Sequence, residues 1–189
     1  MRIIRLGELP SRPWKNGGGV TVEYIVSPEG ADLETFDWRV SRAEVATDGP
    51  FSLFAGIDRT LTITDGTGID LVFADGAVRL LPGSAPFAFS GDVSVEGRLV
   101  AGPIHDLNVM SRRSRFAHRV ERMALPAEIA PPMPGAVRFV VVLGSVAARS
   151  DGRTETLAAG DMIFVGEERV ALEASTSGEA LMIEMLQIQ

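Results

Sequence analysis

The amino-acid sequence predicts an all-β protein built from two jelly-roll-type β-barrels packed together, with little helix. Apolar and polar residues alternate in short runs such as 20–26 and 36–45, which is the two-residue period of a β-strand. Tight-turn dipeptides, among them Asp75-Gly76 and Asp151-Gly152, separate these runs. No stretch shows a long 3.6-residue apolar period. Many short strands joined by tight turns are typical of small antiparallel barrels.

The first part of the chain reads as a series of such strands, each ended by residues that interrupt a sheet. Pro28 and Gly30 end the first strand, and Pro82-Gly83 ends the fifth. The predicted strands are 20–26, 36–45, 59–64, 69–73, 77–81, 94–100, 105–110 and 116–123.

A proline-rich connector follows. Four prolines fall within residues 125–135, which makes a stiff segment and a candidate domain boundary. Beyond it the order of strand, hairpin, glycine corner and apolar strand repeats, over 136–148, 154–157, 162–165, 169–174 and 180–188. We therefore expect a first barrel at 1–125, a connector at 126–135, and a smaller barrel at 136–189 that N-terminal strands complete.

Composition excludes several classes of function. The 189 residues include 18 Lys and Arg against 25 Asp and Glu, a net charge of -7, which is unsuited to non-specific binding of nucleic acid or an anionic membrane. The absence of cysteine excludes disulfides and thiolate chemistry. The first residues form no apolar signal-peptide core, so a soluble, cytoplasmic protein is expected.

The segment 14–21, Trp-Lys-Asn-Gly-Gly-Gly-Val-Thr, gathers residue types that the chain otherwise avoids. Lys15 is the only lysine, and Asn16 is one of two asparagines. Three successive glycines free the backbone, and their N–H groups could form a nest for an anion. This combination indicates more than a simple turn.

Side-chain alternation groups further polar residues. Arg39 and Ser41 share one face of their strand, and Asp106, Asn108 and Arg112 share one face of theirs. If these strands line one barrel, Lys15, Arg39 and Arg59 could converge on an anionic ligand, because guanidinium groups bind carboxylates in a bidentate manner.

Ordinary structural roles remain open for the same residues. Arg39 could pair with Glu44 or Glu23, and Arg59 with Asp58 or Asp48, as surface ion pairs. The polar face that contains Asp106 and Asn108 could equally be a solvated sheet face.

A metal-dependent reaction is not expected. Barrels of this type hold transition metals through several histidines and a glutamate, whereas this chain has only His105 and His118, on different predicted strands. His105 and Asp106 point to opposite faces of a strand, so they form no dyad. No Gly-x-Ser-x-Gly elbow is present to support serine catalysis. We therefore expect neither a metal nor a cofactor.

Five blocks of the sequence resemble the HutD/Ves family in order and in unusual residues. These blocks are the Trp-Lys-Asn-Gly-Gly-Gly-Val-Thr-x-Glu of 14–23, the Phe-x-Trp-Arg-Val-Ser-x-Ala-Glu-Val of 36–45, the Gly-Pro-Phe-Ser-x-Phe-x-Gly-Ile-Asp-Arg of 49–59, the Phe-x-Gly-Asp of 89–92, and the Asp-Leu-Asn-Val-Met-x-Arg of 106–112. The resemblance implies a bicupin of the cupin superfamily. Carried over by motif position, it implies a ligand-binding pocket formed by Lys15, Asn16, Arg39, Ser41, Glu44, Arg59, Asp106, Asn108 and Arg112.

The resemblance also implies a bacterial, metal-free binding protein that regulates, or governs, histidine utilisation. The implied ligand is a small anionic metabolite such as N-formylglutamate, whose two carboxylates suit a basic pocket. The related Ves branch is linked to stress responses, which leaves that context open.

Two other classes of function compete with this hypothesis. One is a cofactor-independent cupin enzyme, such as an isomerase, epimerase or lyase, with Glu44 or Asp106 as general base and Lys15 as acid or electrophile. The other is an interaction protein whose polar clusters only shape hairpins. Neither nucleic acid nor a membrane is expected as a partner. Exposed edge strands favour pairing of two copies as a homodimer.

Overall fold

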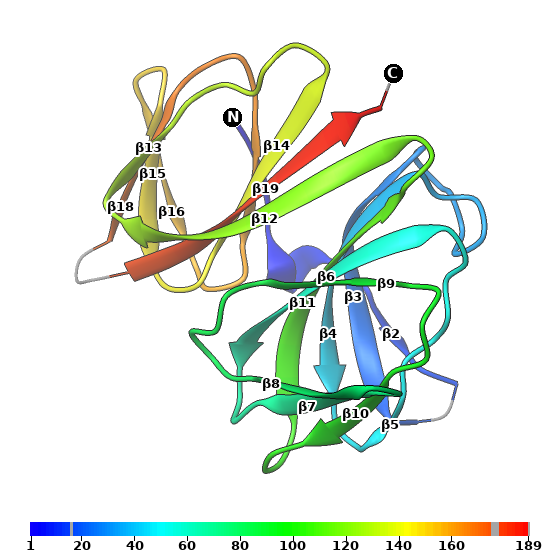
Figure 1. Ribbon diagram of the computed structural model, residues 1–189. Coiled ribbons are helices and arrows are strands. Elements are labelled where there is room, and N and C mark those ends of the chain that lie inside the picture. The colour runs from blue at the N-terminus through cyan, green and yellow to red at the C-terminus, as the bar shows by residue number, and fades with distance from the viewer. Residues whose placement is uncertain (16, 175–177, 189) are drawn as a thin grey trace. The chain divides into compact units, whose positions relative to one another are not determined.

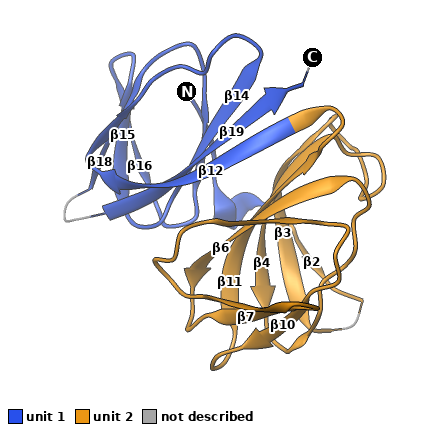
Figure 2. Ribbon diagram, viewed as in Figure 1, with its two compact units in different colours: residues 1–9, 117–189 blue, residues 10–116 orange. Residues whose placement is uncertain are grey.

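The computed structural model describes residues 1–15, 17–174 and 178–188, and more than half of them lie in short antiparallel strands (Figure 1). The chain divides into two compact units, one formed by residues 1–9 and 117–189 and the other by residues 10–116 (Figure 2). The all-β prediction is confirmed, and among the described residues the only helix is the 3₁₀ turn Leu6–Glu8.

Residues 10–116 form two facing sheets. One sheet has the order β2-β3-β4-β11-β6-β9 and the other the order β5-β10-β7-β8. Their bounds are β2 Ser11–Pro13, β3 Gly19–Ser27, β4 Trp38–Val45, β5 Gly49–Pro50, β6 Ile57–Asp65, β7 Ile69–Phe73, β8 Gly76–Leu80, β9 Phe87–Ser90, β10 Glu96–Leu99 and β11 Ile104–Arg112.

The two sheets of this unit share a core. Leu61 and Ile63 from one sheet pack with Ile69, Leu71 and Leu80 from the other, and all five are buried. These residues recur at every second position of their strands, so one face of each strand points into the barrel. The opposite faces of β7 and β8 carry the exposed ion pair of Asp70 and Arg79.

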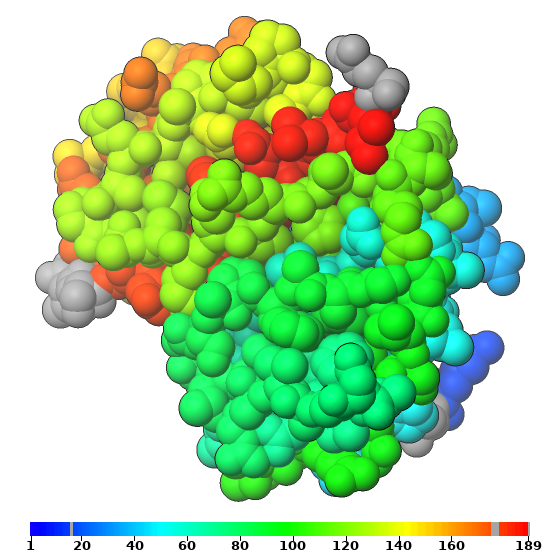
Figure 3. Space-filling model, in the orientation of Figure 1, coloured from blue at the N-terminus to red at the C-terminus, as the bar shows by residue number. Residues whose placement is uncertain are grey.

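The other unit is also built from two sheets, in the orders β1-β17-β14-β19-β12 and β13-β18-β15-β16. Its strands are β1 Arg2–Ile4, β12 Phe116–Leu125, β13 Ala127–Ile129, β14 Ala136–Val142, β15 Val146–Ser150, β16 Arg153–Leu157, β17 Met162–Val165, β18 Val170–Ala174 and β19 Gly178–Gln187. Val140 and Ile163 of the first sheet pack with Ala148 and Leu172 of the second. Figure 3 shows β19, in red, lying beside its neighbour β12 on the surface of this unit.

The N-terminal segment belongs to this unit. β1 pairs with β17, and the buried Asp161 accepts hydrogen bonds from the Leu6 backbone N–H at 3.0 Å and from Arg5 Nη1 at 2.9 Å. The same carboxylate accepts a bond from the Ala158 N–H, which closes the corner before β17. The Gly160-Asp161 corner therefore joins the start of the chain to its last third.

The division of the chain differs from the predicted one. The boundary falls at 116–117 instead of within 126–135, and residues 1–9 separate from the rest of the predicted first barrel. The prolines at 126–134 do not mark a linker between domains, because β12 before them and β13 among them pair within the sheets of one unit. The proline-rich segment is a corner where the chain passes from one sheet to the other.

Candidate functional site

Between β2 and β3, backbone hydrogen bonds join Trp14 to Gly17 and Gly19. The Trp14 N–H donates to the Gly19 carbonyl at 2.9 Å, and the Gly17 N–H donates to the Trp14 carbonyl at 3.0 Å. A Cβ on Gly19 would lie 2.3 Å from the Glu44 carbonyl oxygen and 3.1 Å from the Trp14 ring, so only glycine fits there. Gly17 has a φ of 72°, the left-handed region. Close packing therefore explains Gly19, and the left-handed backbone explains Gly17, both without a ligand.

The inward face of β4, β11 and β6 carries the polar residues that the sequence singled out. The register pairs Asn108 with Ser41 on one side and Leu61 on the other, and it pairs Met110 with Arg39 and Arg59. Asp106 lies one row further along, between Ala43 and Ile63. Because every second residue of a strand shares a face, these side chains all project into the barrel. We call this set the polar belt: Arg39, Ser41, Arg59, Asp106 and Asn108.

Arg59 is a buried cation, and no carboxylate among the described residues contacts it. Only 4 % of the residue is exposed. Its guanidinium carbon lies 5.2, 5.5 and 5.1 Å from the ring centroids of Phe51, Phe54 and Phe89. Its one hydrogen bond is a long one from Nη1 to the Ser52 carbonyl, at 3.3 Å, and Nε has no partner. Aromatic faces attract this charge, yet most of its N–H donors are left for a ligand.

Burial shifts the pKa values of the two charged residues that lie deepest. Removal from water lowers the pKa of Arg59 to about 10, and the negative charge of Asp106 opposes that change. Burial raises the pKa of Asp106 to about 7, against the attraction of Arg59 and Arg42. Asp106 Oδ1 and Asn108 Oδ1 are buried oxygens without a hydrogen-bond partner. Buried polar atoms are normally paired, so these two oxygens are candidate contacts for a bound molecule.

The other arginine of the polar belt is neutralised. Arg39 Nε donates to Glu23 Oε2 at 2.7 Å, and Nη1 donates to Ser41 Oγ at 3.2 Å. This is one of the ion pairs that the sequence left open. Arg39, Glu23 and Asn108 are only partly buried, although all three project inward. Solvent therefore reaches the barrel interior beside the polar belt.

Three of the predicted site residues that the structure describes lie outside the polar belt. Glu44 is on the opposite face of β4, beside His105, whose Nε2 is 3.7 Å from Glu44 Oε2. Arg112 ends β11 and donates to the backbone carbonyls of Phe36 and Glu34, at 3.1 and 2.8 Å. Asn16 lies outside the described residues.

Lys15 is exposed on the turn before Gly19, and it does not converge with the arginines as the sequence suggested. Gly19 pairs with Val45 at one end of β3, whereas Arg39 pairs with Val26 near the other end. Seven residues of strand separate the two positions, which is about 23 Å.

Sequence reasoning missed the aromatic residues around Arg59. Phe51 and Phe54 lie in a recognisable block, but nothing local shows that they cover a cation. The pairing of Arg59 with Phe89 across β6 and β9 is a long-range register.

Among the described residues, no three His, Asp or Glu side chains are grouped so that they could hold a metal ion. The same residues include no helix that could span a membrane.

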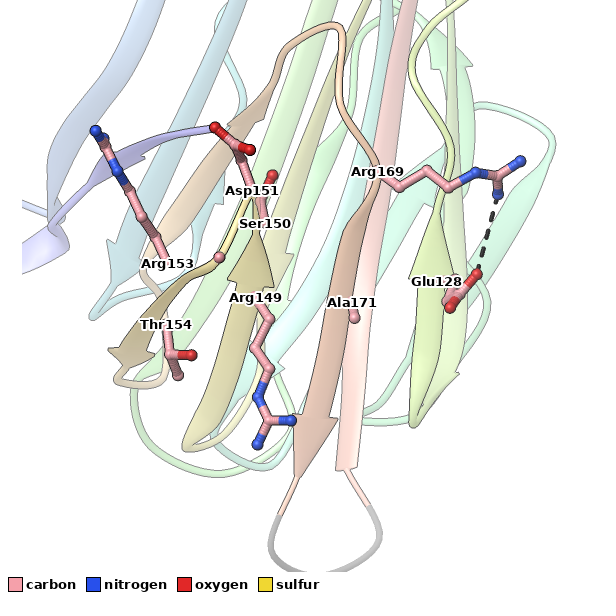
Figure 4. A pocket seen from close by; sticks show the side chains of 9 residues that line it. Glu128, Arg149, Ser150, Asp151, Arg153, Thr154, Arg169 and Ala171 are labelled. Carbon is pink, nitrogen blue, oxygen red and sulfur yellow. Dashed lines mark ion pairs between the residues drawn. The ribbon is translucent and has the colours of Figure 1, made fainter.

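A concave region lies in the unit that contains β13, β15, β16 and β18. This depression of about 480 Å³ is lined by Arg149, Arg153 and Arg169 together with Glu128 and the turn between β15 and β16. Figure 4 shows the three arginines pointing away from one another, and Arg169 lies 4.0 Å from Glu128. The cations do not converge on one point, so the depression lacks the geometry of an anion site.

Comparison with known proteins agrees with this fold. The family model described as HutD matches residues 7–182. An uncharacterised 21.2 kDa protein encoded in the region 3' of hutC in Pseudomonas putida is 39 % identical over 122 residues, which cover 64 % of this chain and 63 % of that protein. The protein Ves of Citrobacter koseri is 35 % identical over 121 residues, covering 64 % and 62 %. The match thus spans under two thirds of these relatives.

Solved structures match over almost the whole chain. HutD from Pseudomonas fluorescens SBW25, solved in a formate condition, has a TM-score of 0.81 and 30 % identity, covering 100 % of this chain and 99 % of that one. A conserved protein of unknown function from Pseudomonas aeruginosa PAO1 has a TM-score of 0.86 and 29 % identity, covering 98 % of both chains. A cupin 2 barrel protein from Leptotrichia buccalis, at 12 % identity and a TM-score of 0.62, covering 99 % of this chain and 96 % of that one, shares the fold alone. The chain belongs to the HutD family of cupin-like proteins, which is associated with histidine utilisation.

Proposed function

We propose that the polar belt binds a small carboxylate metabolite, with N-formylglutamate as the leading candidate, and that the protein regulates histidine utilisation by sensing this ligand. The observation that supports the proposal best is Arg59, a buried guanidinium held by three aromatic rings, with Nε unpaired. A buried cation without a carboxylate is costly, and an anionic ligand would compensate it.

The ligand would make its strongest contact with Arg59. A carboxylate accepts two parallel N–H···O bonds from a guanidinium, and such bonds are stronger in an interior from which water is excluded. Asn108 and Ser41, one row along the sheet, supply further polar contacts on the same face. This arrangement uses binding groups only, so the proposed role is recognition without turnover and without a metal.

A screen of thermal stability tests the proposal. N-formylglutamate, glutamate, urocanate and histidine are added separately, and the melting temperature is recorded by calorimetry. A ligand that binds only the native state at a hundred times its Kd stabilises by about 2.7 kcal/mol, which raises the melting temperature of a chain this long by roughly 5–10 °C. The shift should vanish in Arg59→Met and shrink in Arg59→Lys, which keeps the charge but loses the fork.

The matched control is Arg79→Met, because Arg79 is exposed and pairs with Asp70 on the outer face of the second sheet. This variant should keep the full response. If none of the four compounds shifts the melting temperature of the wild-type protein, the proposed function is wrong.

One observation favours a second candidate, a cofactor-independent enzyme. Asp106 has a raised pKa of about 7, which suits a general acid or base near neutral pH. Glu44 does not serve in this alternative, since it faces away from the polar belt. Proton NMR of each compound incubated with the protein distinguishes the two functions, because an enzyme forms product and loses that activity in Asp106→Asn.

A further inference from the structure

Asp106 and Arg59 occupy the same barrel interior without forming an ion pair. Asp106 pairs across the sheet with Ile63, four residues from Arg59 on β6, so about 13 Å of strand separates their backbones. The row of Asn108, Ser41 and Leu61 lies between them. Both residues are almost completely buried, with 1 % and 4 % exposed. Each charge is felt by the other, but neither satisfies the other's hydrogen bonds.

A carboxylate bound at Arg59 would bring a second negative charge into this interior. Like charges in a medium of low dielectric repel strongly, and a buried carboxyl responds by taking up a proton. Asp106 is the acid one row along the sheet from Asn108 and Ser41. No donor bonds its Oδ1 to stabilise the ionised form. We propose that ligand binding at the polar belt is coupled to protonation of Asp106, so that the protein takes up one proton with each carboxylate that it binds. The inference rests on the proposed function.

Among the described residues, the nearest neighbours of Asp106 on its own face of the sheet are apolar. Ala43 and Ile63 are its direct neighbours, and the facing sheet presents the apolar Ile69, Leu71 and Leu80. The charged groups on its own face are Arg59, the pair of Arg39 and Glu23, and Arg112 at the far end of β11, which donates to backbone carbonyls. The other charged residues of β4, β6 and β11 lie on the opposite face, and they are Arg42, Glu44, Asp58, Asp65 and His105.

The direction of the effect follows from linkage. A bound anion raises the pKa of Asp106 further above the value of about 7 that burial already produces. Below pH ~7 Asp106 is protonated in the free and bound states alike, and affinity is constant. Above it, binding requires proton uptake, so the Kd weakens by up to about tenfold per pH unit until the pKa of the bound state is reached. A ligand carboxylate with an ordinary pKa stays ionised throughout this range and contributes nothing to the slope.

Isothermal titration calorimetry with N-formylglutamate tests the coupling directly. Titrations at pH ~8 in phosphate and in Tris, whose ionisation enthalpies differ, report the number of protons taken up per ligand. The wild-type protein should take up close to one proton, and its Kd should weaken from pH ~7 to pH ~9. Asp106→Asn should take up none and should give a flat profile.

His105→Gln is the matched control. His105 neighbours Asp106 in sequence but lies on the other face, between Glu44 and Asp65 at 3.7 and 3.4 Å. This variant should keep the proton uptake of the wild type, and loss of the uptake would assign the effect to the histidine and overturn the inference. Persistence of the slope in Asp106→Asn would do the same.

A measurement on the wild-type protein needs no variant. The ¹³C shift of the Asp106 carboxyl, followed against pH, gives its titration midpoint with and without N-formylglutamate. The midpoint should rise on addition of the ligand, and an unchanged midpoint with ligand bound overturns the inference while the proposed function stands. If none of the four compounds binds at any pH, both fall together.

Discussion

Arg59 and Phe89 face each other directly across β6 and β9, with the guanidinium carbon 5.1 Å from the ring centroid. The contact replaces the carboxylate that a buried arginine usually requires. It holds the cation in place and leaves its hydrogen bonds to be made elsewhere. A cation held in this way is positioned for a ligand that binds reversibly.

Phe89→Leu tests this relationship. Phe87, on the same strand, packs on Phe89 at a centroid distance of 6.0 Å and makes no cation–π contact with Arg59, so Phe87→Leu removes similar apolar area and serves as the control. We expect Phe89→Leu to lower the free energy of unfolding by about 0.5–2 kcal/mol more than Phe87→Leu does. Urea denaturation of both variants measures the difference, and equal losses would show that the cation gains nothing from the ring.

The stability of the protein should depend on Asp106 between acid and neutral pH. A folded pKa raised to about 7 means that the native state holds a proton which the unfolded chain releases near its ordinary pKa, so stability falls as pH rises through this interval. Asp106→Asn removes that loss. The free energy of unfolding of Asp106→Asn, relative to that of the wild type, should therefore rise by about 2–3 kcal/mol between pH ~5 and pH ~8. Urea titrations at both pH values check this growth, and a constant difference would contradict it.

Asp92 should have the opposite dependence. Its pKa is lowered to about 2, first by the hydrogen bond from the Gly56 N–H and then by bonds from Ser90 and Arg113. A lowered pKa contributes stability above the ordinary value near 4 that is lost as pH falls towards 2. The stability difference between the wild type and Asp92→Asn should thus become smaller as pH falls through that acid range. Acid titration followed by circular dichroism would show this change.

Gly19→Ala should destabilise the barrel through a backbone clash. The added Cβ would meet the Glu44 carbonyl oxygen at 2.3 Å, whereas at Gly49 a Cβ meets nothing within 4 Å. We expect a loss of about 2 kcal/mol or more for Gly19→Ala, and little change for Gly49→Ala, in thermal denaturation.

Replacing predicted residues outside the polar belt should leave ligand binding intact. Glu44→Gln and Lys15→Met alter an outward face and an exposed turn, so the Kd for N-formylglutamate should stay within about twofold of the wild type. Asn108→Leu, inside the polar belt, should weaken binding about tenfold, because one hydrogen bond is worth about a factor of ten. Titration calorimetry compares the three.

Strand period made much of this arrangement predictable. Alternation along 36–45 and 105–112 is enough to place Arg39 with Ser41, and Asp106 with Asn108, on common faces, and the register joins these faces. The same rule puts Glu44 on the other face, although motif resemblance grouped it with the pocket. Period alone did not reveal that Arg112, at the end of β11, turns to the carbonyls of Glu34 and Phe36.

Long-range register was beyond sequence reasoning. The pairing of Gly19 with Val45 decides at which end of the sheet Lys15 lies. The aromatic contacts of Arg59 depend on the pairing of β6 with β9. Prolines at 126–134 predicted a linker because a corner between two sheets of one barrel requires the same residues.

The pairing of β1 with β17 also sets an order of events during synthesis. Ile4 pairs with Met162, so β1 leaves the ribosome long before its partner strand exists. Residues 10–116 are contiguous and contain every strand of their own two sheets, so that unit can fold while β1 is still unpaired. β1 is therefore incorporated into its sheet long after it is made, and closure of this sheet requires that the chain has been translated at least as far as β17.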